Sequence, residues 1–120
     1  MGTQASPTPR PRRLCALDDV EDTESAGATA VIAGREEPLI LVRRGDKVWC
    51  YVNRCPHIGA PLDFKPGWFL TLDKSLIQCA NHGAQFEIET GLCLVGPCVG
   101  KSLVPVAIEV ADGEVRLAGD

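Results

Sequence analysis

Two short cysteine–histidine pairs constrain the fold of this chain more than any other feature. Cys55 and His57 form the first pair, Cys79 and His82 form the second, and the chain has no other histidine. Thiolates and neutral imidazoles are ligands of transition metals. Because residues 58–78 separate the pairs, a shared metal site requires the fold to bring two distant loops together.

The spacing inside the pairs bears on the kind of metal centre. Two thiolates and two imidazoles can bind one zinc ion, or a 2Fe-2S cluster in which one iron takes both cysteines and the other takes both histidines. Structural zinc sites usually place two to four residues between the members of a pair, whereas only Pro56 separates Cys55 from His57. In a two-iron centre each pair serves two different irons, so the short spacing favours the cluster, with zinc as the alternative.

At these pairs and at four nearby motifs the chain resembles the Rieske iron-sulfur proteins, over roughly residues 12–118. The motifs are Ile58-Gly59, His82-Gly83, Thr90-Gly91 and Gly96-Pro97. Among the branches of the family, small free-standing ferredoxins are the most similar, here with a Gly-Pro-Cys turn in place of the commoner Gly-Pro-Ala. The resemblance implies one Rieske-type 2Fe-2S cluster, with Cys55, His57, Cys79 and His82 as its ligands.

The resemblance also implies which residues surround the cluster. Ile58 and Pro97 would shield it from water, although a loop anchor and a simple turn residue are the competing interpretations. Gly59 and Gly83 would allow the backbone to approach the cluster, and ordinary turn glycines would look the same in the sequence. Ala84 follows directly after the second ligand loop and completes the predicted surroundings.

High-potential Rieske proteins have hydroxyl donors near the cluster and a disulfide that braces the ligand loops. By the resemblance, the hydroxyl positions correspond here to Ala84 and Phe86, and no cysteine stands beside the ligands in the positions of that disulfide. These differences predict a low reduction potential. Cys93 and Cys98 instead flank the Gly96-Pro97 turn, either as a local disulfide or as free thiols.

The rest of the sequence predicts an all-β fold. The run 47–52 is rich in strand-forming residues, and Asp112-Gly113 is a two-residue hairpin signal. Pro105 places its strand at an edge or a bulge. Cys15 and Cys50 fall in strand-like runs, where small buried hydrophobic side chains are expected. Alternating apolar residues continue the strand pattern toward the C-terminus, at Phe86, Ile88, Val104, Val106, Ile108, Val110, Val115 and Leu117.

These patterns predict one domain of the Rieske type after a disordered lead. Residues 1–12 carry three prolines and lack hydrophobic periodicity, so they form the lead. Residues 13–120 form a β sandwich or barrel-like base with an inserted cluster-binding subdomain at about 52–97. The acidic stretch 18–24 is expected to be a solvated loop rather than a helical turn.

Charge and hydropathy bear on where the protein is located and on which partners it has. The formal net charge is −4, and no apolar run approaches the length of a membrane span or of a signal-peptide core. We therefore expect a cytoplasmic monomer without nucleic-acid or membrane partners.

The predicted function is that of a soluble one-electron carrier between a flavin reductase and an oxygenase or another redox enzyme. A complete Rieske oxygenase needs a second iron bound by two further histidines, which the chain lacks. Independent substrate turnover is therefore not expected. The alternatives are a small subunit of a nitrite-reductase-like complex and a zinc-binding interaction module.

Overall fold

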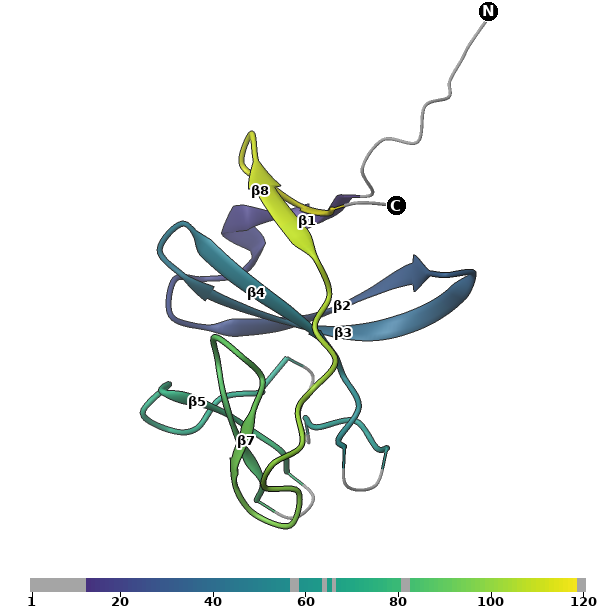
Figure 1. Cartoon of the computed structure of the whole chain (residues 1–120). Helices are drawn as coiled ribbons and strands as arrows, with labels where there is room; N and C mark the ends of the chain where they lie inside the picture. Colours follow the sequence, from purple (N-terminus) through teal and green to yellow (C-terminus); the bar gives the residue numbers. More distant parts are fainter. Residues whose placement is uncertain (1–12, 57–58, 64, 66, 81–82, 119–120) are drawn as a thin grey trace, which may run out of the picture.

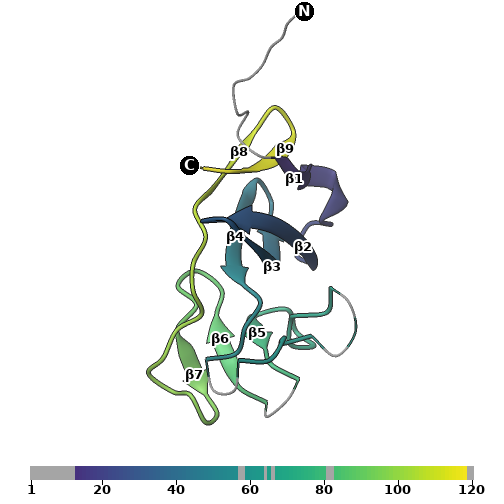
Figure 2. The same ribbon diagram turned by 90° about the vertical axis from the view of Figure 1, so that its right-hand side faces the viewer.

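The computed structural model describes residues 13–56, 59–63, 65, 67–80 and 83–118. They form three small antiparallel sheets that follow one another along the molecule (Figure 1), and Figure 2 shows the same succession after a turn of 90°. The all-β prediction is confirmed. The predicted lead, 1–12, lies outside the described residues.

Each sheet has three strands, and each sheet is named after its place in the molecule. The terminal sheet has the order β1 (Arg13–Ala16), β9 (Glu114–Leu117), β8 (Ile108–Ala111). The central sheet has the order β2 (Ser25–Ile32), β3 (Arg35–Arg44), β4 (Lys47–Val52). The distal sheet has the order β5 (Leu76–Gln78), β6 (Gln85–Glu87), β7 (Cys93–Val95).

Two predictions of local structure are confirmed, one of a strand and one of a hairpin. Strand β4 spans the predicted run 47–52. Asp112 and Gly113 connect β8 to β9, with positive φ angles of 54° and 72° that a tight two-residue hairpin requires. The alternation that begins at Val104 is interrupted, because β8 starts only at Ile108.

The interruption arises because residues 104–106 pair with β4 instead. Val52 donates its backbone N–H to Val104, and Val106 donates its own to Cys50. Between them, Pro105 forms an isolated antiparallel bridge with Tyr51. Pro105 has no N–H to donate, so an edge position suits it, as predicted.

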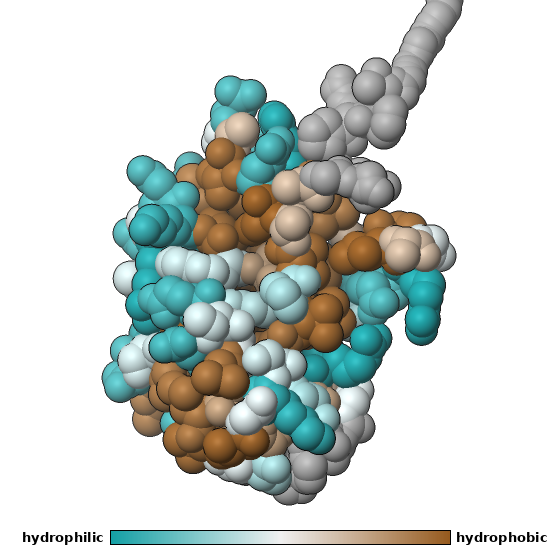
Figure 3. Space-filling model, in the orientation of Figure 1, coloured by the Kyte–Doolittle hydropathy of each residue, from teal (hydrophilic) through white to brown (hydrophobic). Residues whose placement is uncertain are grey.

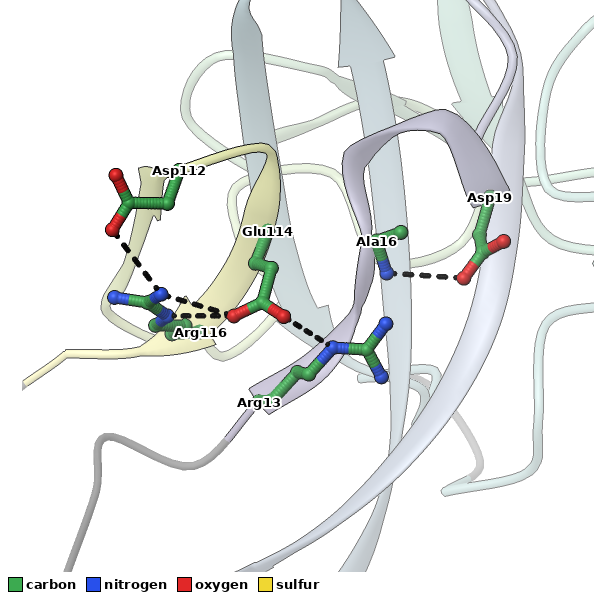
Figure 4. Close-up of polar contacts among 6 residues, drawn as sticks. All are labelled: Arg13, Ala16, Asp19, Asp112, Glu114 and Arg116. Atoms are coloured by element: carbon green, nitrogen blue, oxygen red, sulfur yellow. Dashed lines mark hydrogen bonds and ion pairs between the residues drawn. The ribbon is translucent and has the colours of Figure 1, made fainter.

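The acidic stretch 18–24 begins with the short 3-10 helix η1 (Leu17–Asp19), so the prediction of a loop was wrong there. The Asp19 carboxylate explains the turn, because it accepts a hydrogen bond of 3.0 Å from the backbone N–H of Ala16 (Figure 4). Nearby, the side chains of Arg13 and Arg116 donate hydrogen bonds to Glu114. Bonds from Arg116 first, and then from Arg13, hold the pKa of Glu114 below its ordinary value.

The central sheet separates two apolar clusters. Leu39 and Leu41 of β3 face the terminal sheet, where they pack with Val115 and other apolar residues. The alternate residues Ile40 and Val42 belong to the second cluster, on the side of the distal sheet. Since successive strand residues point to opposite faces, β3 is buried on both sides.

The two cysteines predicted as small buried hydrophobic residues differ in exposure. Cys50 is buried in β4, and burial raises the pKa of its thiol to about 12, whereas Cys15 in β1 is only partly buried. The described residues include no helix long and apolar enough to cross a membrane.

Candidate metal centre

The first ligand loop leaves the end of β4 and turns at Cys55. The backbone N–H of Cys55 donates to the carbonyl of Ala60 at 2.8 Å, and the N–H of Gly59 donates to the carbonyl of Cys55 at 2.7 Å. Gly59 has a φ of +75°, in the region that favours glycine, and a Cβ there would have no neighbour within 4 Å among the described residues. The turn therefore requires this glycine for its backbone angle and not for lack of space.

The second ligand loop leaves β5 and repeats the same turn. Cys79 donates its N–H to the carbonyl of Ala84 at 2.8 Å, and Gly83 donates to the carbonyl of Cys79 at 3.0 Å. Gly83 has a φ of +71°, and a Cβ added there would meet no atom of the described residues within 4 Å. Each cysteine thus begins a six-residue turn closed by the same two hydrogen bonds.

The fold brings these two turns together. The backbone N–H of Ala80 donates to the carbonyl of Leu62 at 2.8 Å, which links the second loop to the first. Cys55 and Cys79 are 2% and 0% exposed and belong to one apolar cluster. His57 and His82, predicted as the other two ligands, and Ile58, predicted as a shield, lie outside the described residues.

Asn53 braces the first loop, and the sequence analysis missed it. Its side-chain oxygen accepts the N–H of Leu62 at 2.7 Å, and its amide donates to Asp63 at 3.1 Å. Asp63 in turn accepts the N–H of Gly67 at 3.1 Å. Among the described residues, Asn53 is the only polar residue that is buried. Its position directly after an apolar strand and two residues before Cys55 was the available signal.

A third loop, at 96–98, lies against the second ligand loop. A Cβ placed on Gly96 would come within 2.7 Å of the α-carbon of Ala84, so the two backbones touch. Ala84 and Phe86 are both fully buried. Pro97, the predicted shield, is exposed at the surface of this loop.

Cys93 and Cys98 are free thiols, one of the two alternatives that the sequence left open. The Cys98 thiol donates to the sulfur of Cys93 at 3.2 Å. Burial first, and then this contact, raises the pKa of Cys98 to about 12.

The described residues alone do not form a complete metal site. They contain no group of three or more His, Cys, Asp or Glu side chains arranged to hold a metal. They do contain two buried thiols in matching turns of adjacent loops, which fits the cysteine half of a Rieske centre.

An exposed apolar patch lies over β7 and the loop that follows it. Leu94, Val95 and Val99 are 45%, 49% and 62% exposed. Figure 3 shows an apolar area at the end of the molecule that holds the distal sheet. This patch is at the same end as the ligand loops, which are joined to β4, β5 and β6 (Figure 1).

Comparison with known proteins identifies relatives along nearly the whole described chain. The chain is 32% identical over 111 residues to Ferredoxin CarAc of Metapseudomonas resinovorans, covering 90% of this chain and 92% of that protein. The ferredoxin of carbazole 1,9a-dioxygenase from Nocardioides aromaticivorans IC177 is 25% identical, with a TM-score of 0.70 and coverage of 92% and 98%.

A third similarity is to a chain in the solved complex of reduced oxygenase and oxidized ferredoxin in carbazole 1,9a-dioxygenase. It is 29% identical, covers 90% of this chain and 92% of that one, and has a TM-score of 0.69. A model of the Rieske [2Fe-2S] domain family matches residues 12–112. The chain therefore belongs to the Rieske [2Fe-2S] domain family.

Proposed function

We propose that this protein is a Rieske ferredoxin, a one-electron carrier that passes electrons from a flavin reductase to an oxygenase. The observation that carries the proposal is the pair of matching turns that brings buried Cys55 and Cys79 together. The similar proteins support it, since two of them are named ferredoxins and one solved complex joins a ferredoxin to an oxygenase.

The ligands in this proposal are Cys55 and Cys79 for one iron and His57 and His82 for the other. When bound, a [2Fe-2S] cluster with two imidazole ligands supplies reversible one-electron transfer at a higher potential than an all-cysteine cluster. The cysteines hold their sulfurs inside the apolar cluster, where Asn53 fixes the first loop through Leu62. The segment 52–97 is the unit that we propose binds the cluster.

The carrier has no substrate site of its own in this proposal. A Rieske oxygenase contains a mononuclear iron with two histidines and a carboxylate, and both histidines of this chain are assigned to the cluster. The exposed patch of Leu94, Val95 and Val99 supplies an apolar docking surface close to the ligand loops. We place the carrier in the cytoplasm as a monomer that meets its partners transiently.

Metal analysis and reconstitution test this function together. Protein purified without oxygen is expected to carry two irons and two acid-labile sulfides per chain. A flavin reductase with reduced nicotinamide should reduce it, and a Rieske oxygenase should reoxidise it. Stoichiometric zinc without labile sulfide would reject the cluster, whereas a loaded cluster that exchanges no electrons would reject the carrier role.

A low reduction potential is the next expected result. Hydroxyl groups that donate to cluster and ligand sulfurs stabilise the reduced state, and Ala84 and Phe86 offer none. The midpoint potential should therefore lie near the lower end of the range of about −150 to +300 mV of Rieske centres. Protein-film voltammetry at neutral pH measures it. A midpoint above about +100 mV, well inside that range, would contradict the argument.

A further inference from the structure

A recess of about 410 Å³ lies between the central and terminal sheets, and it contains none of the predicted ligands of the iron-sulfur cluster. Ile32 and Val52 of the central sheet line one side, and Leu117 of β9 lines another. The segment 104–107, which pairs with β4, forms a further wall. Small-molecule sites in proteins are mostly apolar and have volumes of about 300–1,000 Å³, so the recess is large enough for a small ligand.

The alternation of β3 explains why the recess combines apolar and charged side chains. Arg35 and Glu37 lie on the same face of β3 as Leu39, because alternate residues of a strand share a face. Leu39 is buried in the apolar cluster beneath the terminal sheet, and Ile32 and Val106 pack against that cluster. The recess is therefore an opening at the edge of the cluster. An apolar group bound there would be removed from water, which favours binding.

The charged residues of the lining select the sign of a ligand. They are Arg35, Arg54 and Glu37, so the recess has one positive charge in excess. Nη2 of Arg54 donates to Oε1 of Glu37 at 2.8 Å, and within the described part of the chain this is the one hydrogen bond of the Arg54 side chain. A guanidinium has five N–H donors, so Arg54 keeps others for an anion. Arg35 is exposed and adds a second guanidinium.

Arg54 also connects the recess to the first ligand loop. It directly precedes Cys55, and its backbone N–H donates to the carbonyl of Val52 at 2.8 Å. The N–H of Val52 donates to the carbonyl of Val104 at 2.9 Å, which joins two walls of the recess. A molecule in the recess therefore contacts the segment that leads into the ligand loop, from the face of the central sheet opposite to the apolar cluster of Cys55.

We propose that this recess binds a small apolar carboxylate, with the carboxylate on Arg54 and Arg35 and the apolar part against Val106 and Leu117. The planar fork of a guanidinium matches the two oxygens of a carboxylate. An inorganic anion would leave the apolar lining in contact with water. The excess positive charge disfavours cations, which include the arginine-containing segment 1–12. The ligand is bound and not converted, and its binding does not depend on the proposed iron-sulfur cluster.

Calorimetric titration with cinnamate and with its neutral analogue cinnamamide tests the proposal. Cinnamate should saturate one site per chain, and cinnamamide should bind about tenfold more weakly or worse, because it cannot form charged hydrogen bonds. Arg54→Gln should weaken the binding of cinnamate by a similar factor. The matched control is Glu37→Gln, which breaks the same ion pair but keeps the guanidinium, so cinnamate should bind as tightly as to the wild-type protein or more tightly.

Ala107→Trp tests the location of the probe, because Ala107 is an exposed residue of the recess wall and a large side chain there should prevent binding. Urea denaturation shows that each variant is folded, and if Ala107→Trp is not, Arg54→Gln and Glu37→Gln decide alone. Absence of saturable binding, equal binding of cinnamate and cinnamamide, unchanged binding in Arg54→Gln, or equal weakening in Arg54→Gln and Glu37→Gln would overturn the proposal. Unchanged binding in folded Ala107→Trp would place the probe elsewhere and overturn it too.

Discussion

Replacing Cys79 with alanine should yield protein with almost no iron or acid-labile sulfide. The thiolate is one of two that hold an iron in the proposed cluster, and no other described side chain completes a metal site in its place. Loss of a metal site is among the few single changes that cost more than about 4 kcal/mol of unfolding free energy. Metal analysis measures the content of iron and labile sulfide, visible absorption shows whether the cluster is present, and urea denaturation gives the free energy of unfolding. Cys55→Ala, His57→Ala and His82→Ala should behave in the same way.

Cys50→Ala is the matched control for this prediction. Cys50 is buried to the same extent as the ligand cysteines, but it belongs to the apolar cluster on the other face of the central sheet. The variant should keep its full complement of iron and sulfide and lose only the packing of one small side chain. A Cys79→Ala protein with the wild-type spectrum, or a Cys50→Ala protein without a cluster, would show that the ligand assignment is wrong.

Replacing Gly96 with alanine should destabilise the protein and loosen the contact between the third loop and the second ligand loop. Gly96 has a φ of +106°, and a Cβ there would lie 2.7 Å from the α-carbon of Ala84. A positive φ costs a residue with a side chain about 1–2 kcal/mol, and overpacking typically costs about 1–3 kcal/mol more. The expected loss of unfolding free energy is therefore about 2–5 kcal/mol, by the same principles.

Gly100→Ala separates the two causes of that loss. Gly100 has a similar φ of +92°, but a Cβ there would meet no part of the described chain within 4 Å. It should show only the backbone cost, so the difference between the two variants in urea denaturation measures the contact with Ala84. The cluster spectrum should also change in Gly96→Ala and not in Gly100→Ala. Equal losses in both variants would mean that the third loop does not support the ligand loop.

Local sequence patterns predicted the elements whose cause is local. The run 47–52 forms β4, and Asp112-Gly113 forms its hairpin, because strand propensity and turn geometry depend on adjacent residues. The alternation from Val104 onward was misleading, since those residues pair with β4 across more than 50 positions of sequence. A period of two marks extended residues but does not identify the partner strand, so the sequence alone could not separate 104–106 from β8.

In the candidate site, too, the features with a local cause could be predicted from the sequence, and those that depend on distant contacts could not. The spacing of Cys55 and Cys79 from their histidines pointed to the ligand set, and the glycines after them pointed to turns, which the backbone hydrogen bonds now describe. The brace of Leu62 by Asn53 carries no motif, and the contact of Gly96 with Ala84 joins loops that are apart in the chain. They depend on how the loops pack, so the fold was needed to find them.

The burial of β3 on both faces has a consequence for the protein before it receives its iron. Among the described residues, the cluster of Leu39, Leu41 and Val115 contains none from the ligand loops, because the central sheet separates it from them. Local stability in proteins follows such packing units, each of which can open at its own free energy. The newly made chain therefore contains a preassembled half that includes β4, the strand from which the first ligand loop leaves, while the metal end still awaits its cofactor.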